Sequence, residues 1–200
     1  NWLYFTWLSG DHVVEQHVHN VDVMNWIFRS HPIRATSIGG RQVRTGIERW
    51  GNIYDHFCTE FVYPDGRGGE LTVTSTCRQI DGCDSHVAEY AVGTRGKAKA
   101  SGLILGEKPW KFEGKAANPY VQEHADLVAG IRAGRPLNEG RAVAESSMTC
   151  ILARMSAYSG KTVLWDWAMN ESKLDYTPAS YAMGPKPVDP VATPGKSPLV

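Results

Sequence analysis

Two alternating segments joined by a tight turn constrain the fold of this chain more than any other feature. Polar and apolar residues alternate through 54–63 and again through 71–80, and Pro64-Asp65-Gly66 follows the first segment. A period of two places successive side chains on opposite faces of a strand, and a turn rich in Pro, Asp and Gly reverses the chain. The pattern therefore predicts an antiparallel β-hairpin.

Further strands and helices are expected on both sides of this hairpin. Four other segments are predicted as strands: 33–38, 86–93, 98–105 and 162–167. Apolar residues at helical spacing predict three helices, over 13–28, 120–133 and 139–159. Short strands in succession, without helices between them, favour antiparallel pairing. The expected fold class is α+β: a mostly antiparallel or mixed open sheet, covered on one face by helices.

We expect one domain over residues 1–172 and an extended tail over 173–200. The tail is rich in Pro, Gly and Ser and has no apolar periodicity. The chain starts at Asn1 with an aromatic, core-like segment and shows no signal peptide, so we expect any targeting segment to lie upstream. The four cysteines have neither CxxC nor zinc spacing, which predicts free thiols.

Charge and hydropathy narrow the classes of partner. The 21 Lys and Arg residues balance the 21 Asp and Glu residues and form no basic block, so nucleic-acid binding is not expected. No apolar run approaches the length of a membrane span. We therefore expect a small-molecule ligand and a cytoplasmic location, with export left open.

The chemically richest stretch is the first predicted helix. At about 100° per residue, five side chains fall within an arc of roughly 80°: His12, Glu15, His19, Asp22 and Trp26. A carboxylate four residues before a histidine can hold the imidazole, as a general acid or base requires. The alternatives are a solvated helix face, or a metal site with His12 or Asp22 as third ligand. His17 falls on the apolar side and is predicted as a hydrogen-bonded, near-core histidine.

This stretch, Gly10 to Asp22, resembles a motif of the Gfo/Idh/MocA oxidoreductases, which act on sugars and cyclitols with NAD or NADP. The resemblance continues through four more segments: 51–57, 93–98, 118–139 and 156–165. It implies that His19 is the catalytic histidine, that Glu15 replaces an aspartate that orients it, and that Asp22 is the acidic residue that follows. It also implies the fold of the C-terminal domain of a two-domain dehydrogenase.

The resemblance implies a nucleotide-binding Rossmann domain that is not found in this chain. No G-x-G-x-x-G segment lies between a strand and a helix. In the family, a Glu-Lys-Pro motif precedes the catalytic helix, whereas Glu107-Lys108-Pro109 follows it here, so Lys108 is predicted as a turn lysine. NAD or NADP would then be bound mainly by the missing domain, and this chain alone would be inactive.

By resemblance, the exposed sheet face would hold the substrate and mediate homo-oligomerisation. Arg41, His56 and Arg78 are the candidate substrate contacts there, with His12 and Asp22 from the helix; each is otherwise a surface or packing residue. Arginine suits a polyhydroxylated or carboxylated substrate because it offers several fixed donors. His86 and His124 are weaker candidates.

The predicted function is the substrate-binding and catalytic part of an NAD(P)-dependent oxidoreductase acting on a secondary alcohol of a sugar or cyclitol. Two alternatives remain open. One is a free-standing sugar-binding or dimerisation module that binds no cofactor. The other is a metal-dependent hydrolase or lyase that uses the His12, Glu15 and His19 stripe.

Overall fold

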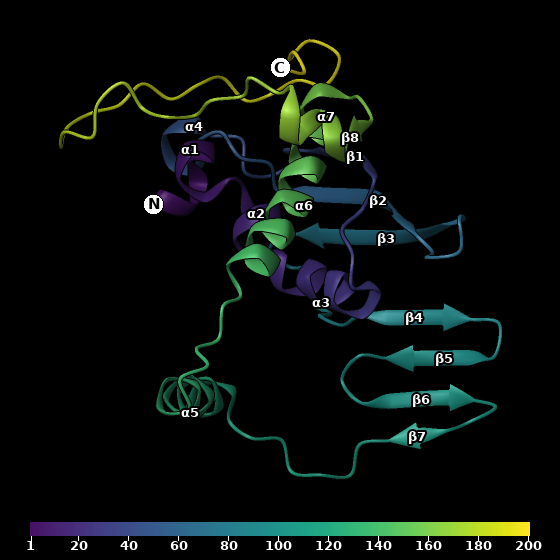
Figure 1. The fold of residues 1–200 in the computed structure, drawn as a ribbon. Helices are drawn as coiled ribbons and strands as arrows, with labels where there is room; N and C mark the ends of the chain where they lie inside the picture. Colours follow the sequence, from purple (N-terminus) through teal and green to yellow (C-terminus); the bar gives the residue numbers. More distant parts are fainter. The chain divides into compact units, whose positions relative to one another are not determined.

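Two units make up the computed structural model, which describes residues 1–200 (Figure 1). The first unit comprises residues 1–85 and 145–200, and the second comprises residues 86–144. Each unit contains its own four-stranded antiparallel sheet. The α+β class with antiparallel sheets is confirmed, but the strands form two sheets, one in each unit.

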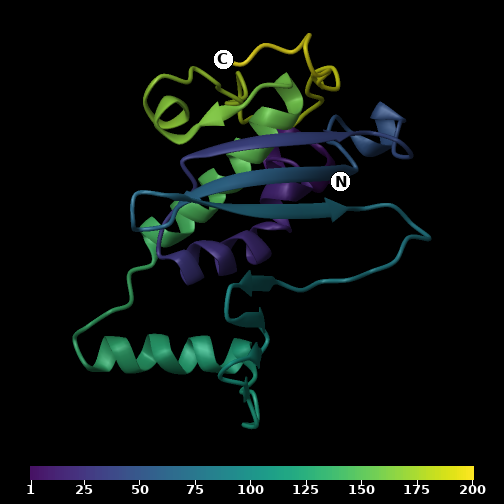
Figure 2. The ribbon, with the colours of Figure 1, turned by 90° about the vertical axis from the view of Figure 1, so that its right-hand side faces the viewer.

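The first sheet has the strand order β3-β2-β1-β8. Its strands are β1 (Arg34–Gly40), β2 (His56–Pro64), β3 (Glu70–Arg78) and β8 (Val163–Leu164). The predicted hairpin is confirmed, since β2 and β3 pair antiparallel along their whole length (Figure 2). Asp65 stabilises the turn because its carboxylate accepts the N–H groups of Arg67 and Gly69.

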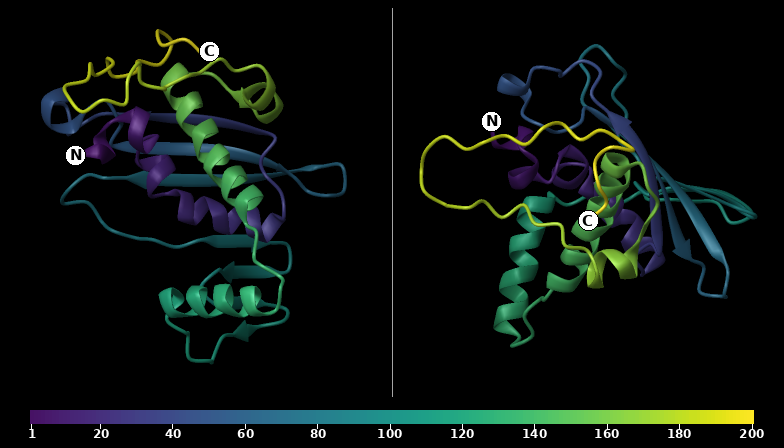
Figure 3. Two further views of the ribbon diagram at one scale, coloured as in Figure 1. Left: turned by 60° about the vertical axis from the view of Figure 1, so that its left-hand side comes forward. Right: turned by 90° about the horizontal axis from the view of Figure 1, so that it is seen from above.

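Helices cover one face of this sheet and leave the other uncovered (Figure 3). The covering helices are α2 (His12–Glu15), α3 (Val18–Phe28) and the part of α6 (Gly140–Ser159) from Glu145 onwards. The core between them and the sheet is apolar and includes Val13, Val21, Phe57, Phe61, Tyr63, Leu152 and Ala153. Every second residue of β1 and β2 faces this core, which is the cause of the alternation seen in the sequence of β2.

Short elements complete the first unit. They are η1 (Trp2–Tyr4), α1 (Thr6–Ser9), α4 (Ile47–Trp50) and α7 (Trp165–Asn170). The predicted strand over 162–167 is therefore wrong in its second half, because only two residues pair with β1 before α7 begins. The segment after α7 contains no helix or strand, and Tyr54 donates a hydrogen bond to the Ala192 carbonyl within it.

The second unit is a strand meander followed by one helix. Its elements are β4 (Tyr90–Gly93), β5 (Gly96–Lys99), β6 (Leu103–Gly106), β7 (Trp110–Lys111) and α5 (Pro119–Arg132). The predicted single strand over 98–105 is wrong: Gly102, at φ 108°, lies in a turn that separates β5 from β6. Lys108 lies in the exposed turn after β6, as predicted.

The structure also describes the state of the cysteines and the apolar character of the helices. All four cysteines are free thiols, as predicted. No helix combines the length and the apolar character that crossing a membrane would require.

Candidate functional site

The helix that carries the predicted His and Glu stripe is interrupted after Glu15. The N–H of Gln16 bonds to the carbonyl of His12, four residues back, but the N–H of His17 bonds to the same carbonyl, five residues back. α3 then begins afresh, with the N–H groups of Asn20 and Val21 on the His17 carbonyl. One continuous helix over 13–28 was therefore a wrong prediction, and the single polar stripe does not exist as one helix face.

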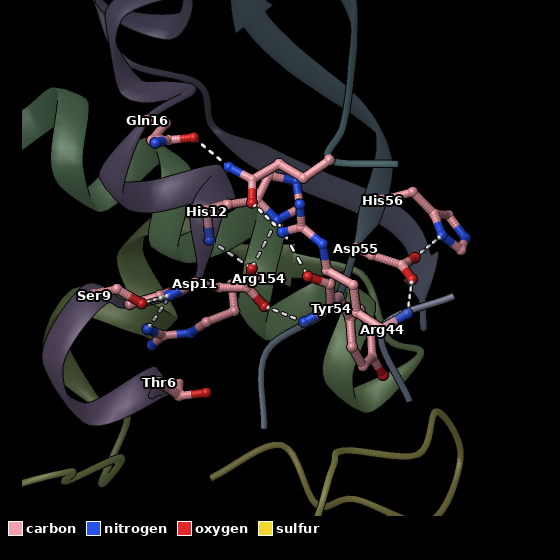
Figure 4. Close-up of polar contacts among 12 residues, drawn as sticks. Thr6, Ser9, Asp11, His12, Gln16, Arg44, Tyr54, Asp55, His56 and Arg154 are labelled. Atoms are coloured by element: carbon pink, nitrogen blue, oxygen red, sulfur yellow. Dashed lines mark hydrogen bonds and ion pairs between the residues drawn. The ribbon is translucent and has the colours of Figure 1, made fainter. Parts of the chain in front are cut away.

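The start of α2 is fixed by a buried aspartate that the sequence motif did not single out. Asp11 lies at φ 85° and is fully buried. Its carboxylate accepts the backbone N–H of His12 at 2.5 Å and the N–H of Tyr54 at 2.8 Å (Figure 4). It also accepts a hydrogen bond of 2.6 Å from the Tyr158 hydroxyl. A buried carboxylate is tolerated only when it is hydrogen-bonded in this way. In the sequence, the feature that could have indicated this role of Asp11 is an acidic residue at a helix N-cap position, directly after a glycine.

His12 is a buried neighbour of this carboxylate. Its side chain is almost fully enclosed, and its ring packs edge-on against Phe57 with 5.2 Å between centroids. Its Nδ1 lies 3.2 Å from the Tyr54 carbonyl and 3.0 Å from Asp11 Oδ1. Because both neighbours are acceptors, Nδ1 carries the proton and Nε2, which has no partner, is left as an acceptor. His12 is thus enclosed, whereas a side chain that contacts a substrate must be reachable from solvent.

Glu15 and His19 lie on the two sides of the break. Glu15 is half-buried, and its Oε2 is enclosed without a hydrogen-bond partner. His19 is exposed in the first turn of α3. The turn between them is tied to the end of β3, because Gln79 donates to the Gln16 side chain and His17 Nε2 lies 2.6 Å from Ser75 Oγ. The prediction of a hydrogen-bonded, partly buried His17 is confirmed.

Asp22 and Trp26, the remaining members of the stripe, lie further along α3. The Asp22 carboxylate accepts a hydrogen bond of 2.6 Å from the Ser146 hydroxyl of α6. Trp26 is exposed. Asp22 therefore links two helices, and His19 is the only histidine of the stripe that is open to solvent.

His56 and Arg78 are brought together at one end of the sheet. They are register partners, and Gly40 is the third residue of the same row. By strand alternation all three lie on the uncovered face, since the neighbouring Phe57 faces the core. His56 Nδ1 lies 2.7 Å from Asp55 Oδ1, and Arg78 donates to the Asp84 carbonyl. Because α2 and α3 pack on the other face, the structure does not group this pair with His19.

Arg41 is held inside the loop that follows β1. Its Nε donates to the carbonyl of Arg44 at 2.6 Å, and its Nη1 donates to the carbonyl of Gly51 at 2.8 Å. Partial burial lowers the pKa of this guanidinium, and the charge of Asp55 opposes that shift. These contacts make Arg41 a loop-closing residue, with most of its donors used on the backbone.

Asp55 is the centre of a polar network that sequence reasoning missed. Its Oδ2 accepts the N–H groups of Gln42 and Val43, both at 2.8 Å, and of Arg44 at 3.1 Å. Burial alone would raise the pKa of this carboxyl, but the N–H of Val43, the His56 imidazole and the other two N–H groups lower it to about 2.

The network continues from the loop to the α2–α3 turn. The Arg44 guanidinium donates to Gln79 Oε1 at 2.6 Å, and the Gln79 amide donates to Gln16 (Figure 4). Contacts between polar side chains this far apart in sequence leave no periodic signal. The network holds the turn that carries Glu15 and His19 against the end of the sheet.

The other candidates contribute little to this region. His86 is exposed and stacks on Tyr90, and His124 is exposed on α5 with its Nδ1 near the Tyr120 carbonyl. No group of three or more His, Cys, Asp or Glu side chains has an arrangement that could hold a metal ion. Among these histidines His19 is exposed on α3, and an exposed imidazole can transfer protons.

Comparisons with known proteins place this geometry in context. No family model and no curated protein sequence matches the chain. Solved structures do match. An aldose-aldose oxidoreductase from Caulobacter crescentus gives a TM-score of 0.57 at 15% identity, with 82% of this chain and 50% of that chain covered. Myo-inositol 2-dehydrogenase from Lactobacillus plantarum gives 0.56 at 15% identity, with 78% and 49% covered.

A third solved structure extends the pattern. GenD2 from gentamicin A biosynthesis, in complex with NAD, gives a TM-score of 0.57 at 18% identity, with 82% of this chain and 50% of that chain covered. The chain thus spans about half the length of the structures it matches. At these identities the likeness establishes the fold. The structural neighbours are oxidoreductases of the Gfo/Idh/MocA type, and this chain has the fold of their C-terminal domain.

Proposed function

We propose that this chain is the substrate-binding and proton-transferring part of an NAD(P)-dependent oxidoreductase that acts on a secondary alcohol of a sugar or cyclitol. The observation that carries the proposal is the break between α2 and α3. It leaves His19 exposed on the first turn of a new helix and leaves the enclosed Glu15 Oε2 without a partner. The shared fold with dehydrogenases that act on aldoses and inositol supports the same assignment.

The residues of this chain do not fit the nicotinamide dinucleotide itself. Such cofactors bind at a parallel βαβ unit with a glycine-rich turn, and both sheets here are antiparallel throughout. We therefore assign the binding of NAD or NADP to a part of the protein outside residues 1–200, and derive no step through the cofactor. We place the enzyme in the cytoplasm.

His19 is assigned the proton transfer. A histidine that solvent and substrate can reach can take the proton of an alcohol as its carbon is oxidised, or return it in the reverse direction. Glu15 is assigned the positioning of this imidazole, since a carboxylate can accept a hydrogen bond from an imidazole N–H.

The other predicted contacts receive different roles. Arg41, His12 and Asp22 already bond to groups of this chain and hold the loop and the helices in place. His56 and Arg78 lie on the uncovered sheet face, so we assign them to that surface and away from the proton transfer.

The test replaces His19 by Asn in the enzyme that contains this chain. NADH or NADPH formation is followed with myo-inositol and with D-glucose, and kcat and KM are separated. We expect kcat to fall about 100-fold or more with a smaller change in KM. The matched control is His124→Asn, an exposed histidine on α5, which should leave both constants unchanged. An unchanged kcat in His19→Asn contradicts the assignment.

We also propose a homo-oligomer that forms through the uncovered sheet face. Ile38 lies on this face and is 72% exposed, between the rows of Thr36 and Gly40. A charge buried at such a contact is costly, so Ile38→Arg should shift the particle toward the monomer in light scattering. Val87→Arg, at a similarly exposed site in the second unit, is the control. An unchanged mass for Ile38→Arg, or a monomeric parent, contradicts this proposal.

A further inference from the structure

One face of the sheet in the second unit carries three lysines and no acidic residue. In an antiparallel sheet, residues that pair across neighbouring strands lie on the same face. The register therefore groups two rows on one face: Tyr90, Lys99, Leu103 and Lys111 in the first row, and Val92, Lys97 and Leu105 in the second. We call this side the lysine face. The opposite side of the same strands carries uncharged residues, namely Ala91, Ala98, Ile104 and Trp110.

The three lysines have no partner of opposite charge within the chain. None of the ion pairs in the structure involves Lys97, Lys99 or Lys111. Between residues 86 and 115, the acidic residues lie outside the strands, at Glu89, Glu107 and Glu113. The chain therefore leaves the positive charge of the lysine face without a neutralising partner, and a negatively charged ligand would be attracted to it.

The spacing of the lysines indicates the size of a ligand that could meet all of them. Lys97 and Lys99 are two residues apart on β5, so their Cα atoms are about 7 Å apart. Lys99 and Lys111 share a row but are separated by β6, so their Cα atoms are about 10 Å apart. These separations suit an extended ligand with several negative charges better than a ligand with a single charge.

Apolar groups lie between these charges and are open to solvent. Tyr90 is 56% exposed, Val92 is 77% exposed and Leu105 is 55% exposed. The Lys99 Nζ lies 5.9 Å from the centroid of the Tyr90 ring, and the His86 ring lies nearly parallel to that ring, with 5.9 Å between centroids. A ligand built from carbon rings could therefore pack on this surface while its acidic groups meet the lysines.

Two other classes of polyanion fit the lysine face less well. Single-stranded nucleic acids bind to several aromatic side chains, on which successive bases stack, whereas Tyr90 is the single aromatic residue of this face. Inorganic polyphosphate has no apolar part that could cover Val92 and Leu105. The combination of separated charges and an apolar surface favours a chain of sugar rings that bear carboxylates.

We propose that the lysine face binds an acidic oligosaccharide, whose carboxylates pair with Lys97, Lys99 and Lys111 and one of whose sugar rings lies on Tyr90. All of these residues belong to the second unit, and none takes part in the proton transfer assigned to His19. The inference therefore does not rest on the proposed oxidoreductase function.

The test is calorimetric titration of the 200-residue chain with tetragalacturonate and with maltotetraose. Both are linear α-1,4-linked tetrasaccharides, and only tetragalacturonate carries carboxylates. We expect saturable binding of tetragalacturonate, about ten-fold or more weaker binding of maltotetraose, and a loss of affinity when NaCl is raised from about 50 to about 300 mM. No binding of tetragalacturonate, equal binding of maltotetraose, or no effect of salt would overturn the proposal.

Other anions separate this class of ligand from negative charge alone. Tripolyphosphate, a tetraglutamate peptide and a deoxythymidine tetranucleotide are charged but lack a pyranose ring, so each should bind more weakly than tetragalacturonate. Equal or tighter binding of any of the three would reject the oligosaccharide as the ligand.

Replacing the three lysines together locates the binding. In the triple variant Lys97→Gln, Lys99→Gln and Lys111→Gln, the affinity for tetragalacturonate should fall about ten-fold or more. The matched control makes the same change of net charge at exposed lysines outside these strands, by replacing Lys108, Lys161 and Lys173 with Gln. Equal losses of affinity in the two triple variants would reject the lysine face as the site. Should the first triple variant fail to fold by circular dichroism, Lys97→Gln and Lys111→Gln are measured singly, since both lysines are exposed; an unchanged affinity in both would count against the proposal.

Replacing Tyr90 tests the contact with the sugar ring. Tyr90→Thr removes the aromatic ring but keeps a residue that favours strands. The affinity for tetragalacturonate should fall about three-fold or more, because the ring surface is lost. Tyr181→Thr, at an exposed tyrosine in the first unit, is the control and should bind as the parent does. An unchanged affinity in Tyr90→Thr would overturn the assignment of a sugar ring to this surface.

Discussion

Replacing Asp55 by Asn tests whether the polar network at the sheet end stabilises the fold. The Asp55 carboxylate is buried and accepts three backbone N–H groups and the His56 imidazole. These bonds favour the charged form and, against the effect of burial, lower the pKa from 3.8 to about 2. A difference of roughly 1.8 pKa units corresponds to about 2 kcal/mol of folding free energy near neutral pH.

The sign of the pH dependence follows from this lowered pKa. The unfolded chain binds a proton at Asp55 below about pH 4, whereas the folded chain resists it until about pH 2. The stabilisation is therefore complete above the unfolded pKa and is lost as the pH falls through the folded one. Roughly half of it should remain at pH 3.

The assay is urea unfolding of the parent and of Asp55→Asn at pH 7 and at pH 3. The difference in unfolding free energy should be about 2 kcal/mol at pH 7 and clearly smaller at pH 3. Asp81→Asn, an exposed aspartate after β3, is the control and should change stability by less than about 0.5 kcal/mol. A penalty for Asp55→Asn that is the same at both pH values would refute the reasoning, as would no penalty at pH 7.

Two further predictions concern backbone fit and a buried hydroxyl. Gly51→Ala should destabilise the chain by more than about 2 kcal/mol in thermal unfolding, because φ is 55° and a Cβ would overlap the Tyr4 carbonyl oxygen. Gly46→Ala is the control: the site has open space around it, so the stability should change by less than about 1 kcal/mol. Equal losses would argue against the steric account. Tyr158→Phe removes the hydroxyl that donates to the buried carboxylate at the start of α2, and it should lower the free energy of unfolding in urea by about 1.5–3 kcal/mol. Tyr181→Phe, at an exposed tyrosine, should leave this free energy almost unchanged. A similar small loss at both positions would contradict the prediction.

The sheet of the first unit was predictable because its signal is local. Alternation in 54–63 and 71–80 exists because every second side chain of β2 and many of β3 face the core, and the Pro64–Gly66 turn needs only neighbouring residues. The start of α5 was predictable for the same reason, since Asn118 caps the helix and Pro119 occupies its first turn. Each of these features is encoded within about ten residues of sequence.

The break between α2 and α3 was not predictable from periodicity. Apolar residues continue at helical spacing across Gln16 and His17, so a helical projection shows no interruption. The break is held by contacts to Ser75 of β3 and to Gln79, which directly follows β3; both lie about sixty residues away. Tertiary contacts outweighed local propensity there, and this separated His12 from His19.

The sequence by itself determined the β2–β3 hairpin and, to within a residue at each end, α5 and α6, because alternation, helical spacing and turn residues are local signals. It also singled out Glu15 and His19, to which we assign the proton transfer as a proposal. Only the tertiary structure decided which polar side chains are buried and what they bond to, as when Asp11 meets the hydroxyl of Tyr158, 147 residues away. The physical reason is that a buried polar group is stabilised by the partner that folding brings to it, and chain spacing does not encode that partner.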